Sequence, residues 1–280
     1  MPELPEIETI KNDLSPHVVG KVIMNVTFPT DPNIRILRRF PSQDTFVRGI
    51  RGTEIENVRR RAKYLVFDLR PSGTLVMHLG MSGQLLLRSM DSPPEPYLRA
   101  VFHLENHIHL RFVDPRKFGE LFLILPSSGK CQFILEKLGP EPLEKDFSLE
   151  YLTNILRKAK RTIKTFLMDQ KVIAGLGNIY SDECLFKAKI HPTRFTYTLD
   201  DDEIRTLHRS IHRTLREAIK RRGTTASDKR YRDGLGRMGK FQDLLQVYQR
   251  RGNACYCCGT VIQSTPIGGR TASFCPRCQK

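Results

Sequence analysis

The sequence has no hydrophobic run that approaches the roughly 18 residues of a membrane-spanning helix. It begins Met-Pro-Glu-Leu-Pro-Glu and so lacks the charged leader and apolar stretch of a signal peptide. Internal repeats and low-complexity tracts are also missing. With 280 residues, 39% of them apolar, the sequence therefore predicts a globular protein of two domains and a small appendage, with no membrane segment.

Cysteine is scarce except at the C-terminal end, where it forms two Cys-x-x-Cys motifs separated by 16 residues. The four cysteines are Cys255, Cys258, Cys275 and Cys278. Four thiolates at this spacing are typical of one tetrahedral Zn²⁺ with no position left for water, so we expect a structural ion. Disulfides or free thiols are the alternatives, but a segment this short has little apolar core and needs a cross-link. Cys257 is an alternative ligand that breaks the two-residue spacing.

Three cysteines lie outside these two pairs of ligands: Cys131, Cys184 and Cys257. An odd number of remaining thiols fits a reducing compartment better than a disulfide framework. We therefore expect a cytoplasmic protein.

Acidic residues are too few to balance the basic ones. The 30 Asp and Glu stand against 46 Lys and Arg, which gives a formal net charge of +16. A polyanion is the simplest partner of such a chain, although solubility alone is an alternative. Clustering of the cations favours the polyanion, because it suits a surface that follows a phosphate backbone. The clusters are Arg59–Arg61 with Lys63, then Arg157, Lys158, Lys160, Arg161 and Lys164, and nine Lys and Arg between 221 and 251.

The pattern of apolar residues changes half-way along the chain. An N-terminal helix with Ile7, Ile10 and Leu14 on one face precedes many short β-rich runs separated by turns, which favours a β-sandwich. Helical periodicity follows a linker near residues 138–142. The expected strands are 22–28, 64–69, 74–78, 84–87, 98–104, 107–113 and 121–125, and the expected helices are 149–158, 163–169, a segment after Gly177, and 200–220.

The N-terminus offers an unusual nucleophile. Removal of Met1 leaves Pro2 as a secondary amine, and an α-amino group titrates near pKa ~8 whereas lysine titrates near ~10.4. The carboxylates of Glu3 and Glu6 follow within one helical turn, so covalent catalysis with proton transfer is within reach. A charged, solvated helix start is the alternative interpretation of these residues taken alone.

Two glycine-containing segments suit phosphate. Gly175-Leu176-Gly177-Asn178 precedes a predicted helix and exposes backbone N–H groups there, although a tight turn is the alternative. Gly268-Gly269-Arg270, between the two cysteine motifs, presents one guanidinium at a turn.

Six segments together resemble the formamidopyrimidine-DNA glycosylase family, in that family's order along the whole chain. The related endonuclease VIII family usually begins Pro-Glu-Gly-Pro-Glu, so Leu4 favours the formamidopyrimidine branch. The segments are Met1–Glu6, Arg61–Leu65, His78–Gly83, Asp114–Gly119, Gly175–Tyr180 and the four cysteines.

The resemblance implies a bifunctional DNA glycosylase and AP lyase that removes 8-oxoguanine and formamidopyrimidines from duplex DNA. It implies an α+β fold with one structural Zn²⁺, and a monomer in the bacterial cytoplasm, associated with the nucleoid through DNA. The implied parts are a β-sandwich domain at 1–135, a linker at 136–148, a helix–two-turns–helix domain with a lesion-capping loop at 149–248, and a zinc finger at 249–280.

The resemblance also implies catalytic roles. Pro2 attacks C1′ to give a Schiff base, which β,δ-elimination then resolves. Glu3 protonates the ring oxygen of the sugar, and Glu6 positions water or shuttles protons. Lys63 donates a proton in β-elimination and contacts phosphate. Arg270 grips the phosphates beside the lesion and is linked to δ-elimination.

Contacts with DNA are implied for a second group of residues. An extruded nucleotide leaves a hole in the duplex, which a flexible thioether, an arginine and an aromatic wedge would fill. The filling residues are Met81, Arg116 and Phe118, and the phosphate-binding residues are Lys164 and Asn178, with Lys160 beside them. Core packing is the alternative for Met81 and Phe118 taken singly.

Two positions depart from the family pattern. Tyr97 stands where many members have a DNA-contacting histidine, so only a phosphate contact through its hydroxyl is expected. The loop 224–240 is more basic than expected, which makes base preference less transferable than reaction type. An oxidised-pyrimidine glycosylase and a non-catalytic zinc-ribbon DNA-binding protein remain the alternative functions.

Overall fold

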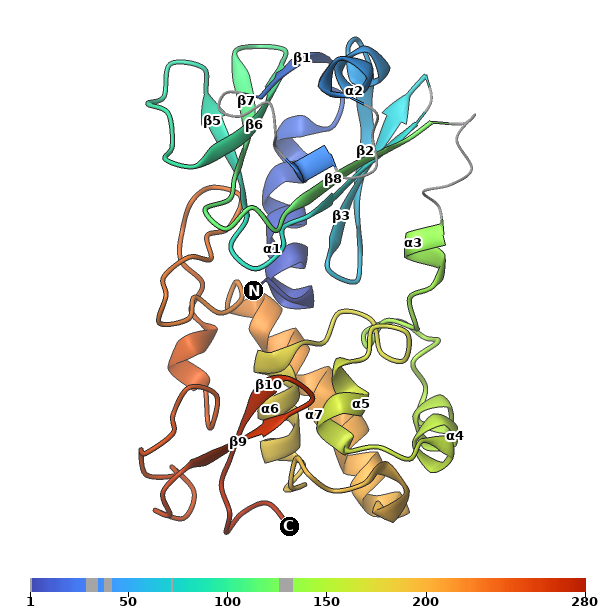
Figure 1. The fold of residues 1–280 in the computed structure, drawn as a ribbon, viewed down its shortest axis with the longest axis vertical. Helices are drawn as coiled ribbons and strands as arrows, with labels where there is room; N and C mark the ends of the chain where they lie inside the picture. Colours follow the sequence, from blue (N-terminus) through green and yellow to red (C-terminus); the bar gives the residue numbers. More distant parts are fainter. Residues whose placement is uncertain (1, 29–34, 38–41, 72, 126–132) are drawn as a thin grey trace. The chain divides into compact units, whose positions relative to one another are not determined.

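The computed structural model describes residues 2–28, 35–37, 42–71, 73–125 and 133–280, so Met1 and Cys131 lie outside the described residues. The chain divides into two compact units (Figure 1). The first unit comprises Met1–Glu136 and Arg221–Gln242, and the second comprises Lys137–Lys220 and Asp243–Lys280. The zinc-finger segment therefore belongs to the same unit as the predicted helical domain.

The segment 221–242 joins the N-terminal unit, whereas the sequence placed it with the helical domain. Residues of this segment donate to the carboxylate of Asp13 on the first helix. Arg222 Nη2 donates to Asp13 Oδ1 over 2.6 Å, and the backbone N–H of Gly234 donates to Asp13 Oδ2 over 3.2 Å. These partners are more than 200 positions apart in the sequence, and local sequence patterns do not predict such pairs.

Two four-stranded antiparallel sheets form the first unit, as the sequence predicted for a sandwich. One sheet has the order β1-β6-β7-β5 and the other has the order β2-β3-β4-β8. The strands are β1 (Ile23–Thr27), β2 (Glu54–Arg61), β3 (Tyr64–Arg70), β4 (Thr74–His78), β5 (Gln84–Ser89), β6 (Leu98–Leu104), β7 (Ile108–Val113) and β8 (Glu120–Ile124). The helical elements are α1 (Leu4–Val18), η1 (Arg35–Leu37), α2 (Gln43–Ile50) and α3 (Phe133–Glu136).

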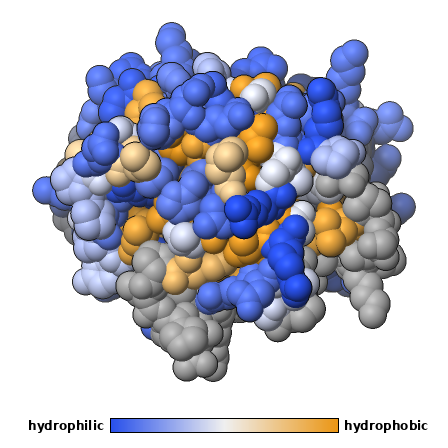
Figure 2. All heavy atoms as spheres, turned by 90° about the horizontal axis from the view of Figure 1, so that it is seen from above, coloured by the Kyte–Doolittle hydropathy of each residue, from blue (hydrophilic) through white to orange (hydrophobic). Residues whose placement is uncertain are grey.

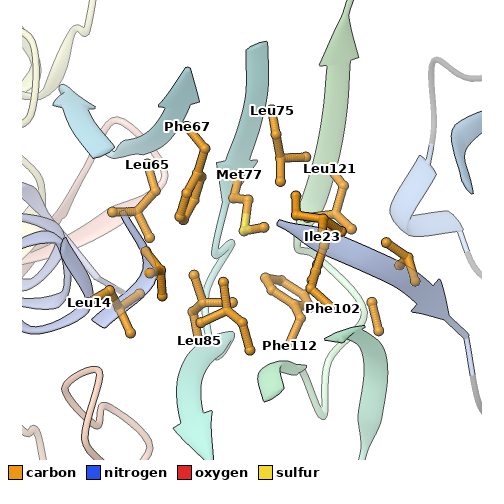
Figure 3. Close-up of a cluster of buried hydrophobic side chains, with 14 of the residues drawn as sticks. Leu14, Ile23, Leu65, Phe67, Leu75, Met77, Leu85, Phe102, Phe112 and Leu121 are labelled. Atoms are coloured by element: carbon orange, nitrogen blue, oxygen red, sulfur yellow. The ribbon is translucent and has the colours of Figure 1, made fainter. Parts of the chain in front are cut away.

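The core of the first unit fills the space between these two sheets. Figure 3 shows Leu65, Phe67 and Met77 from one sheet directed toward Leu85 and Phe112 from the other. Side chains alternate between the faces of a strand, so each strand supplies every second residue to this layer. The first helix closes one side, because Ile7, Ile10, Leu14 and Val18 repeat at helical spacing and are fully buried.

Helices and a hairpin make up the second unit. The elements are α4 (Leu149–Lys158), α5 (Ile163–Met168), α6 (Asn178–Lys187), η2 (Thr196–Thr198), α7 (Asp201–Lys220), β9 (Gln263–Ile267) and β10 (Arg270–Phe274), while η3 (Phe241–Leu244) spans the boundary between the units. The helices expected at 149–158, 163–169 and 200–220 are confirmed to within one residue as α4, α5 and α7. The sequence analysis did not predict α2 and β2, because their charged residues obscure the periodic spacing of their apolar residues.

Hydrophilic side chains predominate on the face shown in Figure 2, with apolar atoms visible between them. Among the helices of the described residues, none combines the length and the apolar character needed to cross a bilayer.

The two-sheet core makes a stability prediction at Met77, whose side chain is completely buried on β4. Met77→Ala should lower the free energy of unfolding by about 2–5 kcal/mol, because it removes apolar contacts and leaves a cavity. Met24→Ala is the matched control, since Met24 is 53% exposed on β1 of the same unit; its effect should stay within about 0.5 kcal/mol. Urea unfolding followed by fluorescence and circular dichroism measures both, and equal effects would contradict the proposed core.

Candidate active site and nucleic-acid contacts

The first turn of α1 brings two buried carboxylates beside Pro2. Pro2 is buried, and Glu3 and Glu6 are each only 1% exposed. They form a capping box, in which the N–H of Glu3 donates to Glu6 Oε2 over 2.8 Å. This arrangement satisfies backbone donors at the helix start and fixes the direction in which the N-terminus leaves the helix.

The second oxygen of Glu6 holds the loop that begins after α7. Glu6 Oε1 accepts the N–H of Thr224 over 2.7 Å, and the hydroxyl of Tyr231 donates to the Glu6 carbonyl over 3.4 Å. Gly223 has φ +76°, and a Cβ there would lie 2.7 Å from Glu6 Oε1, so only glycine allows this approach. Burial, followed by the charges of Glu6 and Asp233, raises the pKa of Tyr231 well above its usual value.

Lys63 lies in the two-residue turn between β2 and β3, where Ala62 adopts φ +53°. Its side chain is largely buried, at 7% exposure. The hairpin is tied to α1, because Arg60 Nε donates to Glu8 Oε2 over 2.7 Å and Arg60 Nη1 donates to the Ala62 carbonyl over 3.3 Å. The ion pair therefore positions the Lys63 turn relative to the helix that begins beside Pro2.

His78 adjoins Lys63 at the end of β4. Its ring lies 4.8 Å from that of Tyr64, and its Nδ1 accepts the N–H of Gly80 over 3.2 Å. Burial, and then the charge of Lys63, lowers the pKa of His78 to about 4. The imidazole is therefore neutral at physiological pH, with Nδ1 acting as an acceptor.

The residues expected to fill the DNA stack come from two adjoining turns. Gly80 packs so closely against the second turn that a Cβ would lie 2.6 Å from the backbone of Phe118. Met81 is partly buried, whereas Arg116 and Phe118 are exposed, with the guanidinium carbon of Arg116 5.1 Å from the centre of the Phe118 ring. The two turns that carry these residues thus lie side by side, and the side chains of Arg116 and Phe118 are exposed to solvent.

Asp114 organises both turns, although the sequence assigned it no role. Its Oδ1 accepts from the hydroxyl of Ser82 over 2.7 Å and from the N–H of Arg116 over 3.1 Å, and its Oδ2 accepts from the N–H of Gly119 over 2.8 Å. A buried carboxylate with three donors holds irregular backbone in one conformation. Tyr97 joins the same region: its carbonyl accepts the N–H of Asp114 over 3.0 Å, and its side chain is 59% exposed.

Lys164 does not present its ammonium for a phosphate contact, which corrects the expectation from the sequence. The side chain is completely buried. Its Nζ donates to Asp182 Oδ1 over 2.6 Å, to Ser181 Oγ over 2.7 Å and to the Asn178 carbonyl over 2.9 Å. An ammonium has three protons, so these three bonds use all of them. Lys160, by contrast, is exposed.

Asn178 is the first residue of α6, after Gly177 at the N-cap. Its Nδ2 donates to the Thr271 carbonyl over 3.0 Å, while its Oδ1 is buried and has no hydrogen-bond partner among the described residues. The predicted entrance to this helix is confirmed, but the N–H of Gly175 already donates to Gln170 Oε1 over 2.8 Å. The N–H of Gly175 is therefore not available to an anion.

Arg270 begins β10 after a two-residue turn in which Gly268 and Gly269 have φ +56° and +72°. Both residues of such a turn need positive φ, which explains the glycine pair. The Arg270 side chain is exposed.

The four cysteines of the two motifs gather at the base of this hairpin. Their sulfurs all lie within 4.8 Å of one another, with 3.5 Å between those of Cys258 and Cys275 and 3.9 Å between those of Cys255 and Cys278. Sulfurs bound tetrahedrally at about 2.3 Å from Zn²⁺ would be separated by about 3.8 Å. The residues therefore fit a single metal ion, and Cys257 is exposed and outside the cluster.

Four residues of these sites escaped the sequence analysis as functional candidates: His78, Asp114, Thr224 and Tyr231. His78 and Asp114 belong to two of the six segments that resemble the family. Their membership of these segments is the signal that could have identified them. Thr224 acts through its backbone N–H, and such a role leaves no signal in the identity of a side chain.

Comparisons with known proteins agree with this geometry. A family model described as the formamidopyrimidine-DNA glycosylase N-terminal domain matches residues 1–121, and one described as the formamidopyrimidine-DNA glycosylase H2TH domain matches residues 138–230. The chain is 43% identical to the formamidopyrimidine-DNA glycosylase of Symbiobacterium thermophilum over 279 residues, covering 100% of this chain and 89% of that protein.

Solved structures extend the similarity to the whole fold. A variant of the Lactococcus lactis FPG protein, in complex with a Fapy-dG containing DNA, has a TM-score of 0.90 at 36% identity, with 100% of both chains covered. MutM in complex with a carbocyclic 8-oxo-G containing DNA has a TM-score of 0.89 at 36% identity, also with 100% of both chains covered.

The chain belongs to the formamidopyrimidine-DNA glycosylase family. It is a bifunctional DNA glycosylase and AP lyase of the formamidopyrimidine type. The resemblance inferred from six short segments is therefore confirmed over the full length.

The low pKa of His78 makes a prediction about pH. The ordinary value is 6.5 and the folded value is about 4, so the unfolded chain binds more protons between these limits. Stability should therefore fall as the pH is lowered from 6.5 to 4. Imidazole NMR should find His78 neutral at pH 5.5, and His78→Gln should lose this component of the pH dependence. Titration of the His78 ring near pH 6.5 would contradict its proposed environment.

Proposed function

We propose that Pro2 is the nucleophile for both activities, the removal of the damaged base and the cleavage of the strand. The observation that carries this assignment is the buried pair of carboxylates, Glu3 and Glu6, held against the N-terminal turn by the capping box. Removal of Met1 gives Pro2 a secondary amine, which attacks C1′ of the damaged nucleotide. The bond between C1′ and the base breaks, the base leaves with a proton, and an iminium joins Pro2 to the opened sugar.

Different side chains near Pro2 carry out the different proton transfers of the reaction. Glu3 protonates the ring oxygen as the sugar opens. Glu6, whose two oxygens hold Glu3 and Thr224, orients the nucleophile and the loop and can relay a proton through water. Lys63 donates a proton during β-elimination, in which a C2′ proton is lost and the bond from C3′ to oxygen breaks. A second elimination breaks the bond from C5′ to oxygen, and Arg270 stabilises the leaving phosphate.

The remaining assignments concern duplex binding. Lys160, Arg270 and Asn178 hold phosphates of the duplex in this proposal. The exposure of the two cations and the position of Asn178 at the start of α6 support it. Met81, Arg116 and Phe118 fill the space left by the flipped nucleotide, and Arg116 reads the base opposite. Tyr97 offers its exposed hydroxyl to a phosphate.

We also assign one structural Zn²⁺ to Cys255, Cys258, Cys275 and Cys278, because their spacing and sulfur geometry suit a closed tetrahedral site. The partner is damaged double-stranded DNA, bound by one copy of the chain. A bacterial cytoplasm, with association to the nucleoid through DNA, fits an enzyme whose relatives are bacterial and whose substrate is the chromosome.

Covalent trapping tests the nucleophile. Sodium borohydride should reduce the iminium on 8-oxoguanine duplex to a stable amine, giving a protein–DNA adduct on a denaturing gel. Acetylation of the Pro2 amine should abolish the adduct. Lys63→Met is the discriminating control: it should still trap, although strand cleavage slows. An adduct lost with Lys63→Met but kept after acetylation would assign the nucleophile to lysine, and faster excision of a pyrimidine glycol than of 8-oxoguanine would overturn the substrate preference.

Two cysteine variants test the zinc site. Cys275→Ser removes one of four ligands, so zinc content should fall well below about one ion per chain and duplex affinity should fall with it, because metal binding and folding are coupled in so small a segment. Cys257→Ser, the matched control in the same finger, should leave both unchanged. Zinc analysis, circular dichroism and duplex titration on the same samples provide the measurements. Normal lesion binding and cleavage by metal-free protein would show that the finger is dispensable.

A further inference from the structure

A buried ion pair in the second unit reaches from the helices to the hairpin that carries Arg270. Lys164 on α5 and Asp182 on α6 are both completely buried, with 2.6 Å between Nζ and Oδ1. The other oxygen of Asp182, Oδ2, accepts the backbone N–H of Ser273 on β10 over 2.9 Å. One carboxylate therefore connects α5, α6 and the hairpin.

Asn178 makes a parallel contact one turn earlier on α6. Asn178 and Asp182 are four residues apart and so lie on the same face of the helix. Asn178 Nδ2 donates to the Thr271 carbonyl over 3.0 Å, while Asp182 accepts from Ser273. Successive residues of a strand point their backbone groups to opposite sides, so Thr271 and Ser273 use the same edge of β10, the edge away from β9.

The hairpin turn is fixed at a third point. A Cβ on Gly268 would lie 2.6 Å from Thr165 Cγ2, which shows how closely the turn approaches the residue that follows Lys164. Arg270 lies between this contact and the two edge bonds at Thr271 and Ser273. Contacts on both sides therefore hold the backbone of Arg270 in place, while its guanidinium is exposed.

We propose that Asp182, paired with Lys164, is a positioning residue for Arg270: its second oxygen sets the hairpin on α6 so that the guanidinium meets the phosphate. The inference rests on the proposed phosphate role of Arg270. Stability alone does not account for the pair, because a buried ion pair is commonly replaced by apolar residues at little cost or even with a gain. What an apolar pair lacks is an acceptor for the N–H of Ser273.

This difference defines two variants. Lys164→Met with Asp182→Leu keeps an uncharged, packed interior but leaves Ser273 without its acceptor. Lys164→Met with Asp182→Asn also removes both charges, but it retains an amide oxygen for Ser273. Arg157→Met with Asp201→Asn is the matched control, since this pair is exposed in the same unit, with 59% and 67% of the side chains accessible.

The measurement is affinity for an 8-oxoguanine duplex, with and without Arg270→Ala. The leucine variant should bind about tenfold more weakly, the size expected for one lost charge-assisted hydrogen bond, and the asparagine variant and the exposed control should bind nearly as well as the parent. In the Arg270→Ala background the leucine variant should cost nothing further, because the residue that it positions is gone. Borohydride trapping at saturating DNA should be unchanged, since Pro2 lies in the other unit.

The outcomes separate the two hypotheses. If Arg270→Ala binds normally, the phosphate role of Arg270 fails and the positioning role fails with it. If Arg270→Ala binds weakly but the leucine variant binds normally, or loses the same factor in both backgrounds, only the positioning role is overturned. Zinc content and circular dichroism show whether the leucine variant folds; if it does not, Ser273→Pro, which removes the donor and leaves both helices intact, takes its place in the same comparison.

Discussion

The carboxylate of Glu6 is the group on which the geometry of the reacting end depends. One oxygen accepts from the N–H of Glu3, next to Pro2, and the other accepts from that of Thr224, which lies 218 positions further along the chain. A carboxylate can hold two separate backbone segments in this way because its two oxygens accept independently. Gly223 makes the approach sterically possible, and Tyr231 adds a bond to the backbone of the same residue. The position of the amine and the path of the loop are therefore set together, so a change at Glu6 disturbs both.

Three other buried carboxylates also accept backbone N–H groups from distant or irregular segments. Asp114 holds the turns of Met81 and Phe118, and Asp182 holds the strand after Arg270. Glu183, also fully buried, accepts three consecutive backbone N–H groups from 246 to 248 over 2.9–3.0 Å. Burial raises the pKa of Glu183, whereas its three backbone donors oppose that rise. Loops that must present a side chain in one place cannot rely on a helix or a sheet ladder, and a buried acceptor with several donors supplies the missing constraint.

Much of the fold and of the site could be read from the sequence, for identifiable reasons. The strands of the sandwich other than β2 and the helices α4, α5 and α7 follow local periodicity, and the cysteine pairs follow metal-ligand spacing. The residues of the site came from motifs, in which several unusual residue types stand close together. The errors concern relations between distant segments. The residues around Asp13 in the sequence do not indicate that it binds Arg222. In the sequence Lys164 is one member of a basic cluster, whereas in the fold Asp182 and Ser181 enclose its ammonium. Burial of a charge is decided by tertiary packing, which neither composition nor spacing reveals.

The net charge of +16 therefore overstates how many cations face DNA. Each basic cluster recognised in the sequence contains members already engaged by carboxylates: Arg59 by Asp68 and Arg60 by Glu8, then Arg157 by Asp201, Arg161 by Asp169 and Lys164 by Asp182, and finally Arg222 and Arg237 by Asp13 and Asp233. The exposed pairs can exchange a carboxylate for a phosphate at little cost, because surface ion pairs contribute little. The buried ones cannot. Burial therefore divides the cations of this chain into two groups. An exposed guanidinium such as that of Arg270 is accessible to a ligand. An enclosed ammonium such as that of Lys164 instead holds parts of the protein together.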